Sequence, residues 1–182
     1  HITNEIKERM QLLGKSGDYD IVITEIGGTV GDIESLPYIE SVRQLIWELG
    51  ENNGIVVHLT LVPYLAAAGE LKTKPTQHSV KTLMESGIKA DILVCRTEHE
   101  LSQDLRQKLA LFCNVKKEAV IQSIDASTIY EVPNLMLEEG LDRVALKKLD
   151  LPEKNTPDLN NWNEFLFRLK NPKHEVNIGL VG

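Results

Sequence analysis

Apolar residues recur along this chain with two alternating patterns, one typical of buried strands and one typical of amphipathic helices. Short β-branched or leucine-rich runs predict buried strands, and apolar positions three and four residues apart predict helices. Their alternation predicts an α/β fold with a parallel sheet flanked by helices. The predicted strands span 20–24, 54–61, 91–95 and 119–124, and the predicted helices span 4–13, 36–49, 75–87, 102–112, 132–139, 142–149 and 158–170.

The remaining segments are predicted to be connections. A long loop is expected over residues 62–74, where no apolar period continues. Residues 151–159 contain two prolines, Asn155 and Thr156, and are the best candidate for a second loop. Residues 172–175 have the composition of a linker.

The composition fits one globular domain that is soluble. The chain has 182 residues, of which 42% are hydrophobic and 26% charged, enough for a sizeable core. Its apolar runs are far too short to cross a bilayer, so no membrane contact is predicted. The net charge of -7 argues against a nucleic-acid binder, whereas a small phosphate ligand needs only a few local cations. Cys95 and Cys113 lie in apolar surroundings without paired spacing, which predicts buried free thiols in a reducing cytoplasm.

An acidic and glycine-rich segment follows the first predicted strand. Glu25 falls where that strand ends, a sharp glycine turn comes next, and Asp32 and Glu34 precede a helix. Ligands of open α/β sheets bind outside the carboxyl ends of the strands, so the segment predicts a metal–nucleotide site. Glu25 could ligate Mg²⁺ or accept hydrogen bonds from the glycine turn. Asp32 and Glu34 could accept hydrogen bonds from ribose hydroxyls or a base amine, or they could cap the helix.

A lysine-containing segment precedes the helix predicted at residues 75–87. Lys72 and Lys74 stand just before its amino end, where cations, helix dipole and free amides could converge on a phosphate. Lysines in a solvated loop explain the same pattern. Gln77 could reach back to the helix cap, and His78 is more often a packed or surface residue than a ligand. We expect this segment and Glu25 to share one edge of the sheet.

Four longer strings of residues resemble the CTP synthase family, in the family's order. They are EIGGTVGDIESLP (25–37), HLTLVPY (58–64), KTKPTQHSVK (72–81) and ALFCNV (110–115). The resemblance extends over essentially the whole chain. It implies that residues 1–171 are the second part of a P-loop-NTPase-like amidoligase domain, which would be incomplete here, and that 172–182 are a linker toward a glutaminase domain.

The resemblance also implies an activity. The family is a ligase of pyrimidine biosynthesis in the cytoplasm: ATP phosphorylates O4 of UTP, and ammonia from glutamine then displaces that phosphate to give CTP. It forms homotetramers and is inhibited allosterically by CTP. The family's ATP phosphate loop and second Mg²⁺-binding acid are expected before His1, and its glutaminase domain after Gly182. The segment alone is therefore expected to lack CTP synthesis.

The family's functional residues transfer to positions that match its strings. Glu25 resembles the Mg²⁺ ligand, and Lys72 is the candidate catalytic residue that neutralises charge on the base O4 or on the transferred phosphoryl group. The nucleotide contacts implied are Lys72, Thr73, Lys74, Pro75, Thr76, Gln77 and Lys108 for the triphosphate of UTP or CTP, Asp32, Ile33 and Glu34 for inhibitory CTP, and Ile124, Asp125 and Ala126 for ATP.

Two other functions stay open at the level of sequence. Without catalysis, the segment could act as a nucleotide-sensing or tetramer-assembly module. A related P-loop ligase such as dethiobiotin synthetase also uses an acid and glycines at a strand end, although the KTKPTQ and IGGTVGDIE strings argue against it.

Overall fold

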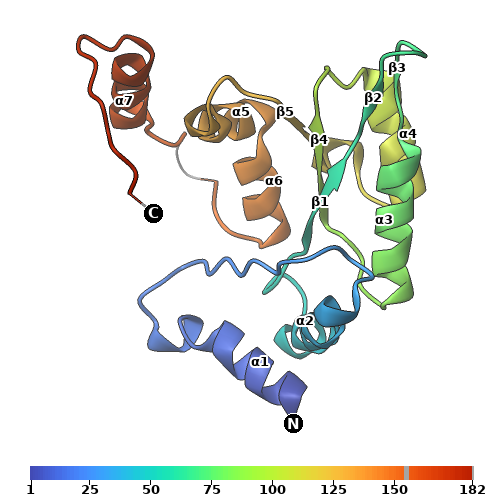
Figure 1. Cartoon of the computed structure of the whole chain (residues 1–182). Helices are drawn as coiled ribbons and strands as arrows, with labels where there is room; N and C mark the ends of the chain where they lie inside the picture. The colour runs from blue at the N-terminus through green and yellow to red at the C-terminus, as the bar shows by residue number, and fades with distance from the viewer. Residues whose placement is uncertain (154–155, 182) are drawn as a thin grey trace.

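A parallel sheet with helices on both faces forms the centre of the computed structural model, which describes residues 1–153 and 156–181 (Figure 1). The predicted α/β fold is thereby confirmed. The helices are α1 (Ile2–Gln11), α2 (Leu36–Leu49), α3 (Lys74–Glu85), α4 (Gln103–Cys113), α5 (Val132–Glu139), α6 (Leu141–Lys148) and α7 (Asn160–Lys170). The strands are β1 (Val57–Leu61), β2 (Tyr64–Leu65), β3 (Glu70–Leu71), β4 (Ile92–Thr97) and β5 (Val120–Ile124).

Strand β4 lies between β1 and β5, and all three run parallel. α3 and α4 lie on one face of this sheet, and α5 and α6 lie on the other (Figure 1). Leu93 and Cys95 pack into the core on the α3–α4 side, whereas Ile92 and Val94 pack with residues of α5 and α6. Burial on both faces explains why β4 has an almost continuous apolar sequence.

Strand β1 is covered on one face only. His58 and Thr60 are buried beneath α3, while Val57, Leu59 and Leu61 on the opposite face are 48%, 65% and 55% exposed. Within residues 1–153 and 156–181, no strand pairs with the edge of β1 that points away from β4. An apolar strip and an unpaired edge therefore meet on this strand.

Helices α1 and α2 lie near the amino ends of the strands. α2 has Pro37 in its first turn and ends at Gly50, as its sequence predicted. Ile39 of α2 packs with Leu83 and Ile88, and the largely buried Lys7 of α1 forms an ion pair with Glu48 of α2. These contacts join the first two helices to the end of the sheet opposite β2 and β3.

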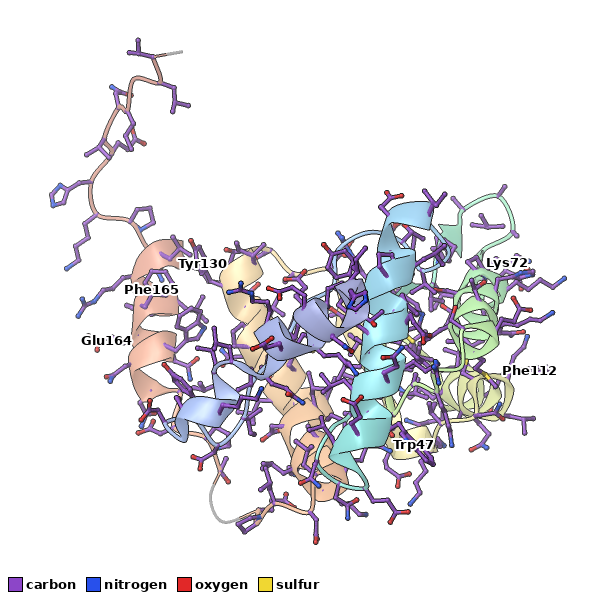
Figure 2. All side chains as sticks on the ribbon, turned by 90° about the horizontal axis from the view of Figure 1, so that it is seen from below. Trp47, Lys72, Phe112, Tyr130, Glu164 and Phe165 are labelled. Carbon is purple, nitrogen blue, oxygen red and sulfur yellow. The ribbon has the colours of Figure 1, made fainter. Side chains whose placement is uncertain are left out.

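The last helix packs through aromatic side chains. Trp162 and Phe165 of α7 contact Tyr130, with ring centroids 6.1 Å and 5.2 Å from the tyrosine ring. Figure 2 shows Tyr130 and Phe165 together beside α7. The amphipathic helix predicted at 158–170 is confirmed from residue 160 onward. The loop predicted at 151–159 has no helix or strand where it is described, and its residues 154–155 lie outside the described residues.

The prediction of a strand over residues 20–24 is wrong. This segment pairs with no strand among the described residues, and Ile21, Val22 and Ile23 are 46%, 36% and 90% exposed. A strand needs hydrogen-bonding partners and a covered face, and β-branched composition supplies neither. The sequence also missed the short hairpin β2–β3, which lies within the loop predicted at 62–74.

Among the described helices, none combines the length and the apolar character that crossing a membrane requires.

Candidate functional site

The carboxyl ends of the three parallel strands form one edge of the sheet, and most of the predicted ligand-binding residues follow it. Leu61 at the end of β1 lies opposite Arg96 of β4, and Thr97 at the end of β4 lies opposite Ile124 of β5. The hairpin β2–β3 and the amino end of α3 follow β1 at this edge (Figure 1). Ligands of parallel sheets bind at such an edge.

The amino end of α3 is fixed to β1 through a buried threonine. Thr76 is completely buried, and its hydroxyl donates to the carbonyl oxygen of Leu61 at 2.9 Å. The same hydroxyl lies 3.2 Å from that of Thr60. Because the Thr76 hydroxyl is engaged inside the protein, this contact positions the helix rather than facing a ligand.

The neighbouring residues of α3 divide into internal and exposed groups. Thr73 is 4% exposed, and its hydroxyl accepts a hydrogen bond of 3.0 Å from the side-chain amide of Gln77. Gln77 thus reaches back to the cap residue, as one of the two sequence interpretations had it. Lys74 and Pro75 are exposed. In this segment, Lys72 and Lys74 are the residues that are positively charged and accessible to an anion.

Lys72 lies at the junction of the hairpin and α3, on the side of the molecule that carries α3 and α4 (Figure 2). Its backbone N–H donates to the carbonyl of Pro63 at 2.9 Å, and its ammonium group forms an ion pair with Glu70 of β3. This ion pair lowers the pKa of Glu70, and the charge of Lys108 on α4 lowers it further. Lys72 and Lys108, predicted from sequence to serve one triphosphate, therefore act on the same carboxylate.

An aromatic pair closes the hairpin onto the end of β4. The ring of Tyr64 on β2 stacks at a tilt on the ring of His99, with centroids 4.0 Å apart. Leu71, paired with Tyr64 across the hairpin, packs against the core beneath α4. Sequence analysis assigned no role to Tyr64, His99 or Glu70, because contacts between β2, β3 and the end of β4 are not visible in a local pattern.

The predicted ATP contacts lie at the end of β5. The backbone N–H of Asp125 donates to the carbonyl of Thr97 at 3.0 Å, and its carboxylate pairs with Arg96 at 3.4 Å. Asp125 is exposed, and Ile124 and Ala126 are half-buried. The structure thus places these three residues on the same edge of the sheet as the lysines.

The glycine-rich segment lies elsewhere, which corrects the expectation that Glu25 shares an edge with the lysines. Val30 packs with Leu83 near the carboxyl end of α3, and a Cβ added at Gly31 would lie 3.2 Å from the side chain of Thr82. These contacts are at the amino ends of β1 and β4. The reason is that residues 20–24 do not enter the sheet, so they do not carry Glu25 to its carboxyl edge.

Asp32, Ile33 and Glu34 begin the turn before α2. The carboxylate of Asp32 accepts a hydrogen bond of 3.2 Å from the backbone N–H of Thr29, and Ile33 is 82% exposed. Glu34 and Glu25 are also exposed. Across residues 1–153 and 156–181, no three His, Cys, Asp or Glu side chains lie close enough together to hold a metal ion. A single exposed carboxylate such as Glu25 does not hold Mg²⁺ by itself.

The two cysteines are buried and free, as predicted. Burial raises the pKa of the Cys95 thiol to about 12 and that of Cys113 to about 11. Thiols with such pKa values are unreactive at neutral pH, because the thiolate is the nucleophile. The cysteines belong to the core and not to the chemistry of the site.

Comparison with known proteins gives one consistent result. The sequence family described as "CTP synthase N-terminus" matches residues 1–151. Proteins named CTP synthase from Flavobacterium johnsoniae, Flavobacterium psychrophilum and Ruminiclostridium cellulolyticum are 92%, 91% and 59% identical to the chain over 182 residues. Each match covers the whole chain but 34% of the relative, so the chain spans about a third of the length of these relatives.

Proposed function

The chain belongs to the CTP synthase N-terminus family, and we propose that it supplies the pyrimidine-nucleotide site of a ligase that converts UTP to CTP. In the whole protein, ATP would phosphorylate O4 of UTP and ammonia from glutamine would then displace the phosphate. Residues 1–171 would belong to the synthetase part and residues 172–182 to a linker. The family match favours this function over the dethiobiotin synthetase alternative.

One observation carries the proposal: Lys72, beside the amino end of α3, forms an ion pair with Glu70, and the charge of Lys108 on α4 also lowers the pKa of that carboxyl. Thr76 fixes that helix end to β1 by its hydrogen bond to Leu61. Lysines and the free amides of a helix amino end both favour bound phosphate. Lys72, Lys74 and Lys108 would therefore hold the triphosphate of UTP or CTP.

Lys72 has a further role in this proposal. Phosphoryl transfer is catalysed mainly by positioning and by neutralising charge. An ammonium group at the hairpin junction would neutralise charge that develops on O4 or on the transferred phosphoryl group. In the full-length enzyme, Lys72→Ala should lower the rate of UTP phosphorylation, and unchanged turnover would contradict this role.

Calorimetric titration of the 182-residue chain with UTP and with CTP tests the binding function. We expect Lys74→Ala to weaken binding of both nucleotides by about tenfold, because a charge-assisted hydrogen bond to phosphate is lost. Lys89→Ala removes an exposed lysine beyond the opposite end of α3 and serves as the control. Equal affinities for the wild type and Lys74→Ala would show that Lys74 does not contact the nucleotide.

A second candidate function is assembly, which the apolar strip of β1 favours. Val57, Leu59 and Leu61 expose a contiguous face on a strand with an unpaired edge, a feature typical of protein–protein contact. Size-exclusion chromatography with and without CTP tests it. A monomer under both conditions would argue against an assembly module.

A further inference from the structure

Glu70 is an acidic partner of Lys72 to which the proposed function assigns no part. It lies at the end of the hairpin, two residues before Lys72, and their side chains form an ion pair. Glu70 and Lys72 are 56% and 40% exposed in their side chains. Ion pairs between exposed groups contribute little to stability, so holding the fold together does not account for this contact.

A carboxylate and a phosphate use the same partners. Both present oxygen anions that accept charge-assisted hydrogen bonds from ammonium groups. The carboxylate of Glu70 already accepts such a bond from Lys72, and the positive charge of Lys108 lowers the pKa of the same carboxyl. A phosphate that approaches both lysines must therefore displace this carboxylate or share the lysines with it.

The surroundings of Glu70 allow the displacement. Its backbone is held by pairing with Leu65 across the hairpin, while the next residue, Leu71, packs against the core. Residues 66–69 at the tip are three alanines and a glycine, and all are exposed. The side chain of Glu70 can thus turn toward solvent without moving Leu71 or Lys72.

We propose that Glu70 competes with phosphate for Lys72 and Lys108 and thereby sets the affinity of this site for its anionic ligand. The proposal rests on the proposed function of the two lysines. It adds a residue that weakens binding: the carboxylate keeps Lys72 paired, and a ligand must supply more charge than one carboxylate to replace it. A triphosphate does so, because it offers several anionic oxygens to both lysines at once.

The test compares Glu70→Gln with the wild-type chain in calorimetric titrations with inorganic tripolyphosphate at low ionic strength. Glutamine keeps the shape of the side chain and removes its charge, so we expect binding to tighten about two- to fivefold, the range typical of an exposed ion pair. Glu85→Gln is the matched control, because Glu85 pairs with Lys81 at 3.8 Å on the exposed surface of α3. It changes the net charge equally and should leave the affinity unchanged.

The outcomes separate this inference from the function on which it rests. Equal or weaker binding by Glu70→Gln overturns the competition, even if binding still depends on the lysines. The same holds if Glu85→Gln tightens binding as much, since net charge alone would then explain the effect. If Lys72→Ala and Lys108→Ala bind tripolyphosphate as the wild type does, or if no chain binds it, the lysine site and the competition are both overturned.

Discussion

Residues 57–61 and residues 20–24 have similar β-branched or leucine-rich sequences, yet only the first segment forms a strand. β1 pairs with β4 along five residues and is covered by α3 on one face. Residues 20–24 have no strand partner among the described residues, and Ile23 is 90% exposed. The comparison shows that a site at a strand end depends on the partners of that strand. The lysines after β1 lie near the carboxyl ends of the strands, while Glu25 does not.

The largest expected effect is the loss of stability when a buried isoleucine is truncated, compared with an exposed one. Ile121 on β5 is 1% exposed, so Ile121→Ala should lower the free energy of unfolding by about 2–5 kcal/mol. Ile23→Ala should change it by less than about 0.5 kcal/mol. Urea denaturation followed by circular dichroism measures both. A loss above about 1 kcal/mol for Ile23→Ala would indicate that residues 20–24 are buried, as the sequence predicted.

The next effect concerns the contact that fixes α3 to β1. Thr76→Val keeps the shape of the side chain but leaves the Leu61 carbonyl without its 2.9 Å hydrogen bond. We expect a loss of about 1–3 kcal/mol in the free energy of unfolding, because a buried polar group is left unsatisfied. Thr82→Val is the control, since the Thr82 hydroxyl bonds to the carbonyl of His78 at an exposed position. Equal losses in the two variants would mean that the Thr76 contact has no special importance.

A smaller effect tests how the glycine-rich segment packs. Gly31 has φ +104°, and a Cβ there would lie 3.2 Å from the Thr82 methyl group. Gly31→Ala should therefore cost about 1–2 kcal/mol in the free energy of unfolding. Gly27→Ala should be nearly neutral, because no atom lies within 4 Å of an added Cβ and its φ is not in the left-handed region. If thermal denaturation finds both variants alike, the segment does not pack on α3.

The smallest effect is a pH dependence of folding stability, caused by His58 on the covered face of β1. Burial lowers the pKa of His58, whose ring lies 2.9 Å from the hydroxyl of Ser79. The unfolded chain then binds more protons than the folded chain below about pH 6.5, the ordinary pKa of histidine. Stability should fall as the pH drops through that range. Urea midpoints at pH 7.5 and 5.5 should differ less in His58→Gln than in the wild type or in His78→Gln, and identical differences would contradict the assignment.

Local signals were sufficient for most of the elements. Pro37 and Gly50 set the ends of α2, and the continuous apolar run of β4 predicted a strand buried on both faces. The hairpin β2–β3 was missed because each of its strands has two residues, too few to show an alternation of apolar and polar positions. Residues 20–24 were misassigned because strand formation also depends on a partner that composition does not reveal.

The candidate site was predicted in part, for the same reason. In the sequence, Lys72 and Lys74 come just before the predicted helix, and a stretch of about five residues is enough to recognise this pattern. Lys108 came only from the resemblance to a family, because its proximity to Glu70 depends on how α4 packs beside the hairpin. Glu70 has no local signal, since an acid two residues from a lysine is common on any surface.

The burial of Cys95 and Cys113 has a practical consequence for labelling. Thiols whose pKa values lie near 12 and 11 form almost no thiolate at neutral pH, so maleimides and similar reagents should leave the native chain unmodified. A cysteine introduced at the exposed Ala67, on the tip of the hairpin, would then be the preferred target for a fluorophore or spin label. The wild-type chain can therefore serve directly as the background for spectroscopic probes of the hairpin.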